Sequence, residues 1–216
     1  MSCKTPLILL VLLFVTKCAS ECGIKVPIRP VLDKGLREIE PIPMHIALFI
    51  DPSLRQWTQE ERQTSMIAGV HHYIFPIGAS LAKNIEEMTQ KVFDEVTILN
   101  ELPGLEKIEA NAYDAVLMVQ LVESTLELIV EDSVCQAIGK HHLSIRATFS
   151  DKQCNTRFDE NLTVEGKHLD IVDFETEGGW WKTAGPKYGP AVEDSIEKVV
   201  SNLAQKLLAS GKQREN

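Results

Sequence analysis

The sequence has no excess of basic charge and, after its first residues, no long apolar run. Its 22 Lys and Arg residues are outnumbered by 31 Asp and Glu, for a net charge of −9. A nucleic-acid-binding protein needs a basic face that displaces counterions from phosphates, so no nucleic-acid partner is expected. With 44% hydrophobic and 25% charged residues, the composition is that of an ordinary globular protein rather than a disordered or collagen-like chain.

Recognisable catalytic motifs are also missing. The chain has no Gly-x-Ser-x-Gly elbow, no His-Glu-x-x-His pair, no phosphate-binding loop and no dinucleotide fingerprint. Asp51 and Pro52 end an apolar stretch and are typical of a turn, while Ser80 is typical of a helix start. We therefore expect a protein that is not an enzyme and needs no cofactor. A hydrolase with an unrecognised site is the third and last alternative.

The first residues form a targeting segment. Lys4 precedes nine consecutive apolar residues, Leu7–Val15, which are followed by the small residues Ala19 and Ser20. This is the layout of a secretory signal peptide, and the run is too short for a spanning helix of about 20 residues. We predict export, with removal of residues 1–17 or of the chain to about Ser20. Removal of 1–17 leaves 20 basic and 31 acidic residues, a net charge of −11.

The stretch Val15-Thr16-Lys17-Cys18 resembles the site at which bacterial lipoproteins are cleaved and acylated. It departs from that pattern at Lys17, where such signals carry Gly, Ala or Ser. The resemblance implies lipidation of Cys18; the alternative is ordinary cleavage near Ser20. Lipidation would leave three other thiols in the mature chain, Cys22, Cys135 and Cys154. Their odd number and the lack of a Cys-x-x-Cys pair predict neither a disulfide framework nor a zinc site.

Apolar runs and alternating patterns predict the strands. The predicted strands are His45–Ile50, Val70–Phe75, Glu95–Leu99 and Tyr113–Val122, the last being central. Leu126–Val130 either continues the central strand or begins another, and Pro52–Gln63 is predicted to form a turn or short helix.

A hairpin of His142–Phe149 and Gln153–Thr163 is predicted to turn at residues 150–152, with Asp151 in the turn. That register places Cys154 opposite Phe149 and Cys135 near His168, too far apart for a disulfide.

Two amphipathic helices are predicted, from about Ala79 to Phe93 and over Ala191–Ala209. The stretch Glu175–Pro190 is rich in glycine, proline and aromatic residues and is predicted to be a loop. Four prolines in residues 18–43 indicate a tether or extended lead-in. The predicted fold is α/β (α+β): one domain, residues 44–210, with a mixed β-sheet, helices mainly on one face and a frayed tail, residues 211–216.

Two features suggest binding sites. The pairs His71-His72 and His141-His142 could supply metal ligands, but neighbours on a strand point to opposite faces, so each pair offers at most one inward ring. The favoured interpretation is ordinary surface or half-buried histidines. In the predicted loop, Trp180, Trp181 and Tyr188 could contact a partner or a membrane interface; the alternative is that the Trp rings fold over the core.

The whole layout resembles bacterial outer-membrane accessory lipoproteins, such as those that help export polysaccharide, lipopolysaccharide or curli. The likeness lies in four segments, Gly78–Phe93, Tyr113-Asp114-Ala115, the hairpin turning at Asp151, and Ala191–Leu208. It implies a non-enzymatic, lipid-anchored assembly or transport accessory, located in the periplasm at the outer membrane. Its expected partners are other cell-envelope proteins or export machinery. The alternative is a soluble exported protein that binds a small ligand or metal.

Overall fold

The computed structural model of the chain describes residues 23–37, 39–65, 69–102, 113–131, 136–171 and 180–212. Its larger sheet has the strand order β5-β2-β6-β7-β8. These strands are β2 (Ile42–Ile50), β5 (Phe93–Leu99), β6 (Ala115–Glu131), β7 (Gln136–Asp151) and β8 (Thr156–Ile171). The smaller sheet has the order β1-β4-β3, formed by β1 (Ile24–Lys25), β3 (Gln59–Ser65) and β4 (Gly69–Phe75). The helices are η1 (Lys34–Arg37), α2 (Pro52–Arg55), α3 (Ile77–Val92) and α5 (Trp180–Lys212).

The larger sheet is mixed. Strand β2 pairs in parallel with β5 and β6, whereas β6, β7 and β8 pair antiparallel. The predicted central position of the strand beginning after Tyr113 is confirmed, since β6 is the third of five strands. The open question about Leu126–Val130 is answered too, because these residues continue β6.

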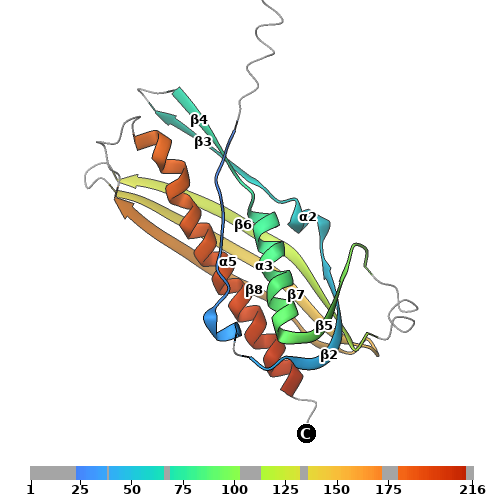
Figure 1. Ribbon diagram of the computed structural model, residues 1–216. Helices are drawn as coiled ribbons and strands as arrows, with labels where there is room; N and C mark the ends of the chain where they lie inside the picture. The colour runs from blue at the N-terminus through green and yellow to red at the C-terminus, as the bar shows by residue number, and fades with distance from the viewer. Residues whose placement is uncertain are drawn as a thin grey trace, which may run out of the picture.

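Helices α3 and α5 pack side by side on one face of the larger sheet (Figure 1). Alternate strand residues such as Leu48, Leu117 and Phe149 are paired across the sheet and buried beneath them. The apolar stripe of α5 contributes Ile196, Val199 and Leu203, all fully buried, from its helical spacing. The predicted α+β architecture, with a mixed sheet and helices mainly on one face, is confirmed.

The smaller sheet contains a strand that the sequence did not predict. Residues 59–65 read Gln-Glu-Glu-Arg-Gln-Thr-Ser, so they lack the apolar alternation by which a half-buried strand is recognised. Backbone pairing with β4, from Gln59 opposite Phe75 to Ser65 opposite Gly69, makes this segment a strand. The prediction of a turn or short helix for Pro52–Gln63 is confirmed for α2, which Asp51 caps, and is wrong from Gln59 onward, where β3 begins.

Part of the segment predicted to be a tether lies packed against the domain. It is extended, as its prolines indicated, but Val26, Ile28 and Leu36 are buried in the core. We call residues 26–31 the strap. A free tether would leave these side chains in water, and burying them instead stabilises the folded state by roughly 1.5–3 kcal/mol for each fully buried aliphatic side chain. The tether prediction is therefore wrong for the strap.

The strap runs alongside α5 in matching register. The backbone amides of Arg29 and Val31 donate to the carboxylates of Glu193 and Glu197, at 2.7 and 2.8 Å. Two extended residues advance about 6.6 Å and four helical residues advance about 6 Å. Every second amide of the strap can therefore reach a side chain on each successive turn of α5. Gly189 lies one turn of α5 before Glu193. Because it has no side chain, the carbonyl of Pro27 can approach closely: a Cβ added at Gly189 would lie 3.2 Å from that oxygen.

Helix α5 begins at Trp180, so the loop predicted for Glu175–Pro190 is wrong from Trp180 onward. Local sequence argues against a helix there, because glycine and proline are its poorest formers. Packing offsets that preference around Tyr188, which is fully buried. Its ring lies over Gly139 of β7, where an added Cβ would come within 3.3 Å of the ring.

The predicted hairpin exists, but its predicted register is wrong by four residues. Phe149 lies opposite Phe158, rather than opposite Cys154. Asp151 closes a longer turn by accepting hydrogen bonds from the backbone amides of Gln153 and Asn155, at 3.0 and 2.9 Å. Cys154 is an exposed free thiol within this turn, and Cys135 lies outside the described residues.

Candidate functional site

The second face of the larger sheet is the candidate site. Neither α3 nor α5 lies on it, and we call it the open face. Strand alternation places on it Val116 and Met118 of β6, with their cross-strand partners Ser150 and Thr148 of β7. All four side chains are partly exposed. They could not be recognised in the sequence, because the first half of β6, residues 115–122, is apolar on both alternations, which predicts a strand buried on both sides.

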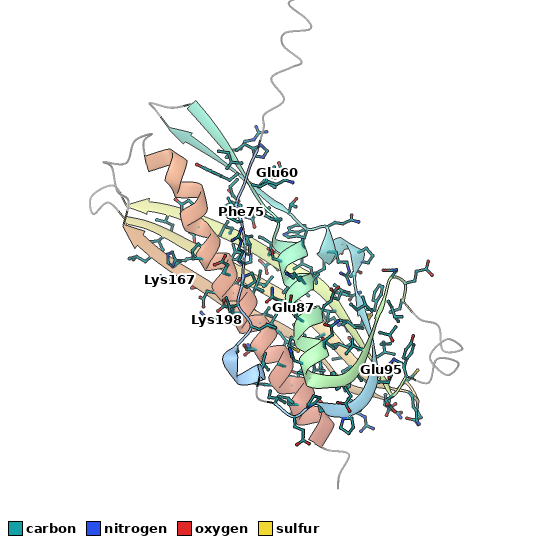
Figure 2. The ribbon with its side chains drawn as sticks, in the orientation of Figure 1. Glu60, Phe75, Glu87, Glu95, Lys167 and Lys198 are labelled. Carbon is teal, nitrogen blue, oxygen red and sulfur yellow. The ribbon has the colours of Figure 1, made fainter. Side chains whose placement is uncertain are left out.

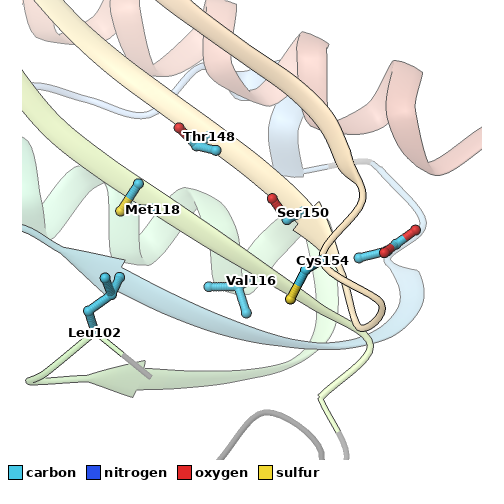
Figure 3. Close-up of a pocket in the computed structure, with 7 residues that line it drawn as sticks. Leu102, Val116, Met118, Thr148, Ser150 and Cys154 are labelled. Carbon is cyan, nitrogen blue, oxygen red and sulfur yellow. The ribbon is translucent and has the colours of Figure 1, made fainter. Parts of the chain in front are cut away.

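A shallow hollow of about 190 Å³ lies on the open face at the end where β6 begins (Figure 3). Strands β6 and β7 form its floor, and Leu102, which follows β5, forms one side. Its lining residues are Leu102, Val116, Met118, Thr148, Ser150, Asp151 and Cys154. Leu102 is 58% exposed, so an apolar wall faces solvent here. Such a surface suits an apolar side chain of a partner better than a charged ligand.

The turn beside the hollow is held by a buried carboxylate. Asp151 is 3% exposed and receives, besides the two turn amides, the guanidinium of Arg157 at 3.0 Å. Burial raises the pKa of Asp151, but the hydrogen bonds from Asn155 and Gln153 and the charge of Arg157 outweigh it, so the pKa lies below its usual value. This carboxylate is therefore an ionised structural group.

The β7–β8 side of the open face is polar. Arg146 makes a two-pronged contact with Asp159, at 2.8 Å through Nε and 2.6 Å through Nη2, and Thr148 donates to the same carboxylate. The hydrogen bonds from Arg146 are the main reason that the pKa of Asp159 falls to about 2. The open face thus combines an apolar strip on β6 with a fixed ion pair, a mixture typical of protein interfaces.

The two histidine pairs occupy different sheets. His72 lies on β4 in the smaller sheet, with Nε2 2.9 Å from Glu60, and the side chain of His71 lies outside the described residues. His141 and His142 lie on β7 in the larger sheet, the first fully buried and the second partly exposed, as alternation predicts. Across the described ranges, no group of three His, Cys, Asp or Glu residues is placed to hold a metal ion.

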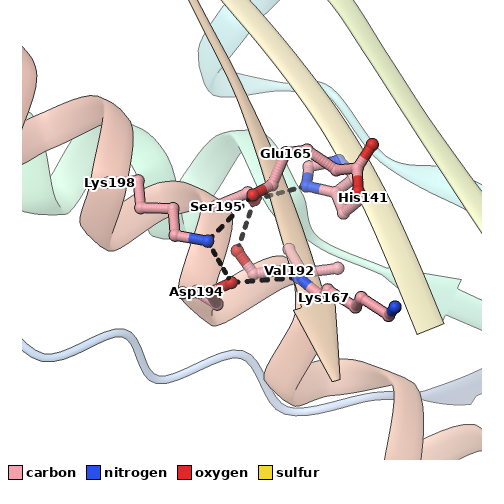
Figure 4. A network of polar contacts seen from close by, with 7 residues as sticks. All are labelled: His141, Glu165, Lys167, Val192, Asp194, Ser195 and Lys198. Carbon is pink, nitrogen blue, oxygen red and sulfur yellow. Dashed lines mark hydrogen bonds and ion pairs between the residues drawn. The ribbon is translucent and has the colours of Figure 1, made fainter. Parts of the chain in front are cut away.

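His141 belongs to a buried polar network between β7 and α5 (Figure 4). Its Nδ1 lies 2.5 Å from the hydroxyl of Ser195, which itself donates to the carbonyl of Val192 at 2.7 Å. Ser195 has a single proton to give, so Nδ1 of the imidazole is the donor and Nε2 accepts from Ser124, at 3.0 Å. Burial lowers the pKa of His141 to about 4, and the neighbouring His142 adds to the effect.

The rim of this network ties β8 to α5. Asp194 accepts from the backbone amide of Lys167 at 2.9 Å and from the ammonium of Lys198 at 2.8 Å. Lys198 also donates to the carbonyl of Glu165 at 2.9 Å (Figure 4). Gly166 lies between these contacts, where an added Cβ would meet the carbonyl of Ala191 at 2.1 Å. The network is therefore a close strand-to-helix junction.

The other predicted contact residues have different outcomes. Cys18 lies outside the described residues, as do the side chains of Trp180 and Trp181, whose backbone begins α5. The prediction that Tyr188 contacts a partner or membrane is wrong, because its fully buried ring packs within the core. No helix in the described part of the chain is both long and apolar enough to span a membrane.

Comparisons with known proteins give structural neighbours only. No family model and no curated protein matches the chain. A DUF330-family protein from Xanthomonas campestris aligns over 89% of this chain and 97% of its own, with 11% identity and a TM-score of 0.47. A minor lipoprotein from Acinetobacter baumannii aligns over 79% and 94%, with 10% identity and a TM-score of 0.41. Lipoprotein GNA1162 from Neisseria meningitidis aligns over 58% and 83%, with 9% identity and a TM-score of 0.32. Two of these three neighbours are named as lipoproteins.

Proposed function

We propose that this chain is an exported envelope protein, anchored through a lipid on Cys18 at the periplasmic side of the outer membrane. In this role it is a non-enzymatic interaction module, an accessory to assembly or transport machinery. The partner is another envelope protein, and the open face is the surface that binds it.

The observation that carries the proposal is the unequal covering of the larger sheet. Helices α3 and α5 bury one face, and the open face carries the partly exposed Met118 and Val116. Val122, at the β-bulge of β6, is 52% exposed, and Leu102 adds a further exposed apolar side chain. An exposed apolar strip rimmed by polar residues is typical of a protein–protein interface.

The Ser–His contact supports the non-enzymatic part of the proposal. A nucleophile–base pair needs an exposed hydroxyl aimed at substrate. The side chains of Ser195 and His141 are both fully buried, and the Ser195 proton is donated to a carbonyl of its own helix. This arrangement suits a structural link between β7 and α5.

In-cell photocrosslinking tests the interaction face. A benzophenone amino acid at Thr148, on the open face, should crosslink to another envelope protein in intact cells. The matched control is Glu87, which is exposed on α3 in the opposite layer. Met118→Glu should reduce the Thr148 crosslink at least tenfold without lowering the melting temperature. Equal crosslinking from Thr148 and Glu87 would contradict the proposed face.

Fatty-acid labelling tests the anchor. Cells fed radiolabelled palmitate should incorporate the label into the wild-type chain and sediment it with membranes. Cys18→Ala should abolish labelling, and Cys22→Ala should leave it unchanged. A wild-type chain that is exported, unlabelled and freely soluble would rule out the lipid anchor.

A further inference from the structure

The chain becomes part of the fold soon after Cys18. Ile24 pairs in parallel with Tyr73 of β4, and the amide of Val26 donates to the carbonyl of Ile74 at 2.9 Å. From there the strap follows α5 and is also held by α3, since the hydroxyl of Ser80 donates to the carbonyl of Ile28 at 3.1 Å. The length of chain free to act as a tether therefore ends near Ile24 rather than at residue 43.

The short tether limits where the lipid can lie. Cys18 lies six positions before Ile24, and a fully extended chain covers about 21 Å over those six steps. Because β1 is parallel to β4, the chain that precedes Ile24 points toward the start of β4. Strand β4 starts at Gly69, four residues or about 13 Å before Tyr73, the partner of Ile24. A lipid on Cys18 can thus lie only about 8 Å beyond Gly69.

One end of the molecule is therefore close to the lipid. We call it the anchor end: the β3–β4 hairpin, β1 and the first turn of α5, which lie together in Figure 1. Glu60 marks this end in Figure 2, and Glu95 lies toward the opposite one. The turn at Asp151 and the hollow of the open face also lie at the opposite end, separated from the start of β7 by about 50 Å of strand.

We propose that the anchored protein stands on a phospholipid bilayer on its anchor end, with the hollow of the open face held away from the membrane. This orientation rests on the proposed function, because it takes Cys18 as the point of lipid attachment. It places the hollow where it meets a partner in the periplasm rather than lipid. It also brings the first turn of α5 to the lipid side.

Energy transfer to a labelled lipid tests this orientation in the lipidated protein purified from membranes. The far probe is a fluorophore on native Cys154, with Cys22 and Cys135 replaced by Ser. The near probe is the same fluorophore on Arg62→Cys of β3, with Cys154 also replaced by Ser. Vesicles of phosphatidylethanolamine and phosphatidylglycerol carry a rhodamine-labelled acceptor lipid. Transfer should be at least threefold more efficient from the near probe than from the far probe.

A lengthened tether is the decisive variant. Ten Gly/Ser residues inserted after Glu21 should bring the near-to-far ratio toward one, because a flexible linker of this length frees the domain to turn. The same insertion after Lys212 is the matched control and should leave the ratio unchanged. A ratio near or below one in the unextended protein, or no effect of the insertion after Glu21, would overturn the proposal.

Palmitate labelling distinguishes a wrong orientation from a missing lipid anchor. A labelled, membrane-bound protein with equal transfer from both probes overturns the orientation alone. An unlabelled protein that does not bind the vesicles overturns the lipid anchor, and the orientation falls with it.

Discussion

The hydroxyl of Ser195 lies 2.5 Å from Nδ1 of His141, so two buried side chains join the last helix to strand β7 of the larger sheet. The contact lies beside Gly166, the cross-strand partner of His141, whose missing side chain lets β8 approach α5 closely. Helix and sheet therefore meet through specific polar contacts as well as through apolar packing.

Ser195→Ala should lower the free energy of unfolding by about 1–3 kcal/mol, because it leaves the buried Nδ1 of His141 without an acceptor. Ser201→Ala, at a partly exposed position of the same helix, is the control and should change stability by less than about 0.5 kcal/mol. Urea denaturation at pH 7 measures both. Equal stabilities of the two variants would show that the buried contact contributes nothing.

Stability should fall between about pH 6.5 and pH 4. Burial lowers the pKa of His141 to about 4 in the folded chain, so over this range the unfolded chain binds the extra proton. The stabilising effect is complete above pH 6.5 and is lost as the pH drops, by up to about 3 kcal/mol. Urea titrations at several pH values should show this slope in the wild type and in His142→Gln, and a much flatter one in His141→Gln. If His141→Gln keeps the same dependence of stability on pH, other titrating groups cause that dependence.

Gly166→Ala should strongly destabilise the fold. Its new Cβ would lie 2.1 Å from the carbonyl of Ala191 and 2.6 Å from the amide of Ser195, both backbone atoms that cannot move without shifting α5. We expect a loss of about 1–3 kcal/mol or more, as for overpacked cores. Gly35→Ala is the matched control, because its Cβ would have only ordinary contacts at 3.7 Å. Thermal unfolding followed by circular dichroism distinguishes them, and similar melting temperatures would refute the close contact.

Asp151→Ala should cost about 1–3 kcal/mol, because the amides of Gln153 and Asn155 then lose their acceptor. Asp159→Ala removes an exposed ion pair with Arg146 and should cost much less, because solvent screens such pairs. Denaturation at pH 7 gives both values. The loss in Asp151→Ala should be accompanied by faster amide hydrogen exchange at the turn, which a purely electrostatic role of the carboxylate would not produce.

The strap should be as important to stability as a core strand. Val26→Ala removes fully buried methyl groups and should lower stability by about 1–2 kcal/mol, whereas Val31→Ala, at a position 58% exposed, should have little effect. A tether would make both changes neutral. Denaturant titration of the two variants decides between strap and tether.

Several elements could be predicted from local pattern alone. The stripe of Leu81, Ile85 and Met88 marks α3, and the continuous apolar runs mark β2 and β6, because burial on one or two faces imposes its period on the sequence. The polar strand β3 carries no such period, since pairing with β4 through backbone atoms, rather than apolar burial, makes it a strand. The open face was equally hidden, because β6 is apolar on both sides whether or not a helix covers it.

The sequence by itself determined the acidic charge and the α+β class, and it predicts an export signal; all three follow from residue type and spacing. Tertiary structure alone decided where the strap and the start of α5 lie. Prolines in the strap and glycines near Tyr188 disfavour regular structure locally, whatever the fold. Burial of Val26 and Tyr188 and the hydrogen bonds to Glu193 and Glu197 outweigh that preference. These contacts join residues more than 160 positions apart in the chain, a distance that no local pattern encodes.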